Sequence, residues 1–120
     1  NRVYMKAKSF SRALLYHLQW KVQLKKFLDG KGTFSIAELS SEECKFGKWL
    51  CSCEATEYAS ESELREFCKV HENLHKAAKR VYGLKMLGND IEARKELARM
   101  EATSMKLASL MTTLRIMNNN

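Results

Sequence analysis

The residues of this chain that could do chemistry are three histidines and four cysteines. His71 and His75 lie four residues apart in a strongly helical stretch, so their side chains leave the same face of a helix. At about 100° per residue, their directions differ by about 40°, which lets both imidazoles coordinate one ion. His17 lies in the apolar stripe of an earlier helical segment. Imidazoles and thiolates are the usual ligands of zinc, so these residues predict a buried metal site.

Spacing leaves open which cysteine would complete such a site. Cys68 lies three residues before His71 on the same predicted face, Cys44 begins a short motif, and Cys51 and Cys53 are also available. A site without metal is a further alternative, in which the histidines are hydrogen-bonded residues of the core. An unpaired imidazole is poorly accommodated there, which favours the metal.

Catalytic metal sites fit the sequence less well. The segment from His71 to His75 matches the H-E-x-x-H pattern of zinc proteases. A hydrolytic zinc needs an open coordination position and a substrate cleft, whereas this small domain offers further protein ligands. A di-iron centre needs inward Glu-x-x-His pairs, which Glu54 and Glu72 do not supply. A Cys–His hydrolase would need a recognisable nucleophile context, and we find none.

The elements that must position these residues are helices. The 120 residues include no proline and only five glycines, which argues against a loop-rich or all-β fold. Apolar residues at three- and four-residue spacings predict three long helices, over about Val3–Leu28, Ser60–Leu87 and Asp90–Met117. The run Ser40–Glu43 predicts the start of a short helix that carries Cys44. We therefore expect an all-α four-helix bundle of three long helices and one short one.

Local signals mark the ends and the inner faces of these helices. Gly30 and Gly88 are expected to end the first and third helices, and Ser60 with Glu63 forms a possible capping box. The last helix carries a heptad seam, formed by Leu97, Met100, Ser104, Leu107, Met111 and Leu114.

Charge and hydropathy narrow the possible partners. The net charge is +7, but the basic residues are scattered over every predicted helix among 14 acidic ones. We therefore expect no nucleic-acid partner. No apolar run approaches the roughly 20 residues that span a bilayer, so we expect no membrane contact by this domain. The cysteines do not suggest a disulfide framework, which is typical of a cytoplasmic protein.

The chain is expected to be a single domain over residues 1–120, cut from a longer protein, because it begins at Asn1 and ends just after a strong helix. The first and last helices carry more apolar residues than one seam needs, namely Leu15, Leu18, Val22, Leu110 and Met117. This surplus predicts a homodimer. The alternative is that these side chains pack against other parts of the parent chain.

Three segments resemble the signatures of the chemoreceptor zinc-binding (CZB) domain family: His17–Lys21, Cys44–Leu50 and His71–His75. Their order and approximate spacing agree with the family, and the C-x-x-G-x-W segment is the most specific. The resemblance implies one zinc held by His17, Cys44, His71 and His75 in a dimeric four-helix bundle. It thereby assigns the cysteine ligand to Cys44, which spacing leaves open.

The resemblance also implies a cytoplasmic regulatory domain without enzymatic activity. Such domains are joined to an output domain in a bacterial signalling protein, of the chemoreceptor or diguanylate cyclase type. We expect a response to zinc level or to oxidation of Cys44; the alternative is a purely structural, zinc-stabilised dimerisation module. Cys51 and Cys68 depart from the family pattern, either as packed side chains or as a resolving thiol for Cys44. Trp20 and Trp49 are expected to wall the site.

Overall fold

A computed structural model describes residues 2–41, 44–52, 55–57 and 59–119, with side chains at residues 12, 15–37, 39–41, 44–52, 55–57, 59–110 and 112. The expected all-α fold is confirmed, with four α-helices, three of them long, and no strand in these ranges. The α-helices are α1 (Arg2–Leu28), α2 (Lys45–Leu50), α3 (Glu61–Met86) and α4 (Asp90–Asn119). Two short 3-10 helices, η1 (Ile36–Leu39) and η2 (Ala55–Glu57), lie in the connections.

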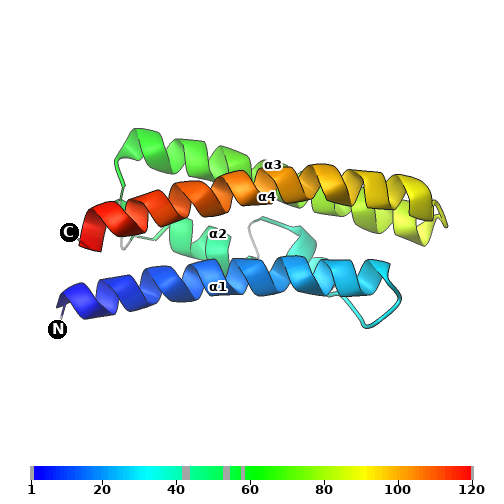
Figure 1. Ribbon diagram of the computed structural model, residues 1–120, viewed down its shortest axis with the longest axis horizontal. Coiled ribbons are helices and arrows are strands. Elements are labelled where there is room, and N and C mark those ends of the chain that lie inside the picture. Colours follow the sequence, from blue (N-terminus) through cyan, green and yellow to red (C-terminus); the bar gives the residue numbers. More distant parts are fainter. Residues whose placement is uncertain (1, 42–43, 53–54, 58, 120) are drawn as a thin grey trace.

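The long helices lie side by side along the 49 Å axis of the molecule. Figure 1 shows that α3 and α4 form an antiparallel hairpin, that α1 runs parallel to α3, and that α2 is inserted beside α1. Both α1 and α3 contact α2, so this short helix bridges the two long ones. None of the described helices combines the length and the apolar character that a membrane crossing requires.

The predicted helix ends are confirmed where local chemistry sets them. The Ser60 Oγ accepts the Glu63 N–H at 3.2 Å, and the Glu63 carboxylate accepts the Ser60 N–H at 2.9 Å, which completes the capping box. Gly30 follows α1 with φ +74° and Gly88 follows α3 with φ +80°. Glycine adopts this left-handed conformation without steric penalty, so both helices stop there.

The predicted start of the short helix is wrong by a few residues. Cys44 is the N-cap of α2 and has an extended backbone, with φ −71° and ψ 132°, so it precedes the helix instead of lying within it. Its carbonyl accepts the Lys48 N–H at 2.9 Å, the first helical bond. A run of capping residues indicates a nearby helix start but not its position, because several neighbours can serve as the N-cap. Glu42 and Glu43 lie outside the described residues.

The core lies between α1, α3 and α4 and is closed by α2. The four residues of the α4 seam from Leu97 to Leu107 are buried, as predicted, whereas Met111 and Leu114 fall outside the described side chains. Ser104, the polar member of the seam, is buried and its hydroxyl has no hydrogen-bond partner within the described part of the chain. The buried apolar residues of the long helices are Trp20, Leu24, Leu28, Phe67, Val70, Leu74, Ala77, Ala78, Val81, Ala93, Leu97, Met100 and Leu107.

Candidate metal centre

Three of the four predicted ligands come together in the interior. The ligand atoms of Cys44, His71 and His75 all lie within 4.8 Å of one another, and each residue is at most 2% exposed. The N-cap of α2 supplies the thiol, and neighbouring turns of α3 supply the two imidazoles. Of the three cysteines in the described residues, Cys44 is the one that the fold brings to the paired histidines.

The two histidines of α3 have the geometry of metal ligands. The Leu39 carbonyl lies 3.0 Å from the Nδ1 of His75 and can only accept, so Nδ1 carries the proton and the lone pair lies on Nε2. The Nε2 atoms of His71 and His75 are 3.1 Å apart. Two nitrogens bound to one tetrahedral zinc lie about 3.3 Å apart, so little movement would admit the ion. The Leu39 contact fixes the ring orientation, as is usual for a ligating histidine.

His17 lies next to this cluster but is not part of it. Its ring centroid is 6.3 Å from that of His71, and the side chain is completely buried. Neither ring nitrogen of His17 has a hydrogen-bond partner within the described part of the chain. Leaving a buried polar group without a hydrogen bond typically costs about 1–3 kcal/mol of folding free energy. An orphaned buried nitrogen of this kind fits a role as the fourth ligand.

Burial also keeps the imidazoles of His17 and His71 uncharged. The pKa of His17 is lowered to about 4, first by burial and then by His75 and Lys21. The pKa of His71 is lowered to about 3, again first by burial and then by His75 and His17. Both rings are therefore neutral near pH 7 and can offer a lone pair, which metal binding requires.

Aromatic side chains surround the cluster. Trp20 packs against His75 at a centroid distance of 4.5 Å and is stacked on His17 at 5.6 Å, so its expected role as a wall is confirmed. Phe46 lies 5.1 Å from His71 and 5.4 Å from His17, a role that the sequence reasoning missed although this residue lies two positions after Cys44. Trp49 is half-buried and stands behind Phe46 at 6.3 Å. These rings shield the ligands from water on the side of α1 and Phe46.

Gly47 lets α2 approach α3 closely. A Cβ atom at this position would overlap the Ser41 carbonyl oxygen and would lie 3.0 Å from the Cε1 of His71. Any larger residue would therefore push α2, and with it Cys44, away from the histidines. The sequence signal was the glycine within the C-x-x-G-x-W motif, but its contact with His71 needed the tertiary structure.

Cys51, Cys68 and Glu72, the other described residues that the sequence offered for chemistry, lie outside the cluster. Cys51 is exposed and Cys68 is half-buried, and both line one small cavity. Packing as a small apolar side chain thus suits Cys68 but not Cys51. Cys53 lies outside the described residues. Glu72, the general base that a protease would need, is exposed and is not among the clustered ligands.

Comparison with known proteins gives one match. Residues 17–82, more than half of the chain, match the family model of the chemoreceptor zinc-binding domain. The matched segment begins at His17 and contains Cys44, His71 and His75. No curated protein and no solved structure matches the chain.

Proposed function

The chain belongs to the chemoreceptor zinc-binding domain family, and from this premise we propose that it is a sensory zinc domain of a bacterial signalling protein. The family binds zinc, and the buried cluster of Cys44, His71 and His75 fits a zinc site. That cluster is the observation that carries the proposal. His17 lies beside this cluster, and neither of its ring nitrogens has a hydrogen-bond partner among the described residues. We propose that it completes a site of three histidines and one cysteine.

The proposed role is regulatory and not enzymatic. Four protein ligands leave a tetrahedral zinc without an open position for substrate or for reactive water. The output belongs to another part of the same polypeptide, of the chemoreceptor or diguanylate cyclase type, in the cytoplasm. The support for this assignment is the family membership of the chain.

The proposed ligands come from three helices, so the packing of the bundle would depend on the state of the metal site. His17 belongs to α1, Cys44 caps α2, and His71 and His75 belong to α3. Bound zinc would couple the packing of these helices to metal supply. Oxidation of the Cys44 thiolate to a sulfenic acid would weaken its coordination and release α2, a helix of only six residues.

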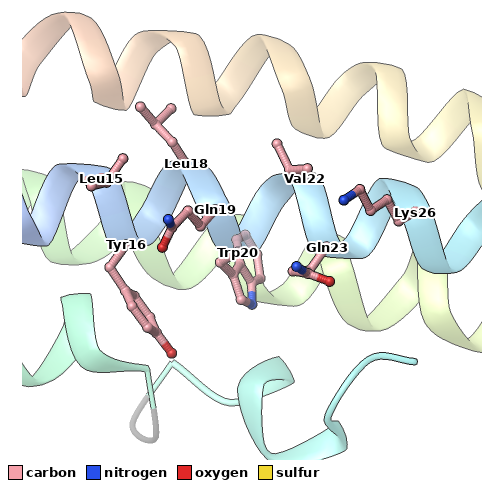
Figure 2. A pocket seen from close by; sticks show the side chains of 8 residues that line it. All are labelled: Leu15, Tyr16, Leu18, Gln19, Trp20, Val22, Gln23 and Lys26. Atoms are coloured by element: carbon pink, nitrogen blue, oxygen red, sulfur yellow. The ribbon is translucent and has the colours of Figure 1, made fainter. Parts of the chain in front are cut away.

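We further propose that a second copy of the chain covers the outer face of α1. Leu15, Leu18 and Val22 are 55%, 37% and 48% exposed, and they line a groove of about 640 Å³. Figure 2 shows these three side chains leaving α1 on one side, while Tyr16 points toward α2. Trp20 also lines the groove and contacts His17 and His75, so α1 would connect the dimer interface to the metal ligands.

Metal analysis of the purified protein tests the site. We expect about one zinc per chain, and loss of the metal in the variants Cys44→Ser and His71→Ala. A Cys68→Ser variant is the matched control, because it removes a thiol near the site but outside the clustered ligands, and it should keep its zinc. A parent protein that purifies without zinc and does not take it up would refute the proposal.

Metal lability distinguishes a sensor from the alternative, a structural module that only holds a dimer together. A chelator of moderate strength should remove zinc from a sensor while far-UV circular dichroism still reports a largely helical protein. A structural module should melt as the metal leaves. Parallel measurement of zinc release and helicity therefore separates these two functions.

A further inference from the structure

A small cavity opens beside the metal centre, between the end of α2 and the middle of α3. Its volume is about 230 Å³, and Cys51, Cys68 and His71 are among the residues that line it. Small oxidants such as hydroperoxides can enter a space of this size, because it holds several water molecules. The cavity therefore gives solvent access to a pair of thiols that the metal site does not use.

The two thiols line the same small cavity. Cys51 is the C-cap of α2, and Cys68 lies in α3 one turn before His71. Burial first, and then the neighbouring Cys51 thiol, raises the pKa of Cys68. Cys51 is exposed, whereas Cys44 is 1% exposed and is held among the metal ligands. An oxidant arriving from solvent meets Cys51 before it meets Cys44.

We propose that Cys51 and Cys68 are an oxidant-sensitive pair that closes a disulfide between α2 and α3, independent of the metal ligand Cys44. A hydroperoxide transfers one oxygen to the Cys51 sulfur, which becomes a sulfenic acid while the peroxide leaves as an alcohol or as water. The Cys68 thiolate then attacks that sulfur, the S–S bond forms, and the S–O bond breaks. The departing hydroxide takes up the proton that Cys68 has lost. Two thiols are thereby oxidised, and one peroxide is reduced.

Such a bond would attach the C-terminal end of α2 to α3. Cys44 holds the N-terminal end of this helix at the metal centre, and Cys51 would hold its C-terminal end on α3. The disulfide would therefore keep α2 in place even when Cys44 no longer binds metal. This assignment does not depend on zinc, because it rests on the cavity that the two thiols share.

Peptide mapping after oxidation tests the pair. The full chain, in a Cys53→Ser background that prevents exchange through the fourth cysteine, is treated with a small excess of hydrogen peroxide, alkylated and digested. We expect a peptide that links Cys51 to Cys68, its loss in Cys51→Ser and in Cys68→Ser, and its persistence in Cys44→Ser. A link from Cys44 to either thiol, or a link between two chains through Cys51, would overturn the assignment.

Thermal unfolding in the presence of a chelator tests separately whether the disulfide holds α2 on α3. The oxidised, metal-free protein should melt roughly 5–10 °C above the reduced one, because the bond closes a loop of moderate length in the unfolded chain. The Cys51→Ser variant should show no such change with oxidant. A linked peptide without a rise in melting temperature would show that the bond forms but does not secure α2. This result would overturn the proposal that the disulfide holds α2 in place.

Discussion

Replacing His17 with leucine should stabilise the metal-free protein and weaken its zinc binding at the same time. The His17 ring is fully buried, and both of its nitrogens lack a hydrogen-bond partner in the described structure. Leucine has a similar volume and leaves no polar atom unsatisfied. The substitution removes a penalty of about 1–3 kcal/mol, so the metal-free protein should melt roughly 3–10 °C higher.

The same substitution removes one proposed zinc ligand. Changing a residue that merely orients a ligand typically weakens metal binding about 10–100-fold, so losing the ligand itself should weaken it by at least about 100-fold. Thermal unfolding followed by circular dichroism, with chelator and with zinc, gives the two stabilities. Competition with a chromogenic chelator gives the zinc affinity. The stability order of His17→Leu and the parent should therefore invert between the two conditions.

Ser104→Ala is the matched control. Its hydroxyl is also buried without a hydrogen-bond partner in the described structure, but it belongs to α4, which supplies none of the proposed ligands. This variant should be as stable as the parent or more stable in both conditions, with unchanged zinc affinity. If His17→Leu instead destabilises the metal-free protein and binds zinc as the parent does, His17 is a structural core residue and the four-ligand site is wrong.

Three other predictions concern the packing, the pH dependence and the dimer. Gly47→Ala should destabilise the protein by about 1–3 kcal/mol in urea titrations and weaken zinc binding, because its Cβ would overlap backbone beside His71. Gly83→Ala is the control: no atom lies within 4 Å of the added Cβ, so this variant should be neutral or stabilising in the same titrations. The pKa values of His17 and His71 are lowered to about 4 and about 3, so the unfolded chain takes up protons below about pH 6.5 while the folded one does not. Metal-free stability should thus be complete above about pH 6.5 and fall steadily toward pH 4, and a urea midpoint that is the same at pH 7 and pH 5 would contradict the burial of these rings. Leu18→Glu should convert a dimer into a monomer in analytical ultracentrifugation without changing helicity, and a dimer that persists would place the interface elsewhere.

The fold was predictable in outline because helix signals are local. The apolar spacings of α3 and α4 and the capping box at Ser60 depend on residues three or four positions apart, which a helix brings together whatever its surroundings. Gly30 and Gly88 ended α1 and α3 as expected, since the left-handed turn is a property of the residue itself. The start of α2 was misplaced, because a six-residue helix has too few turns to show a periodicity.

The candidate site also has one part that the sequence predicts and one part that depends on the tertiary structure. By itself, the sequence determined that His71 and His75 share one helix face, because that relation is contained in four residues of helix. Tertiary structure alone brought Cys44 to them, since its position depends on how closely α2 packs on α3 at Gly47. The Leu39 carbonyl at His75 and the cavity shared by Cys51 and Cys68 likewise bring together segments that no local pattern relates. Local geometry is encoded in spacing, whereas contacts between helices arise only when the whole core is packed.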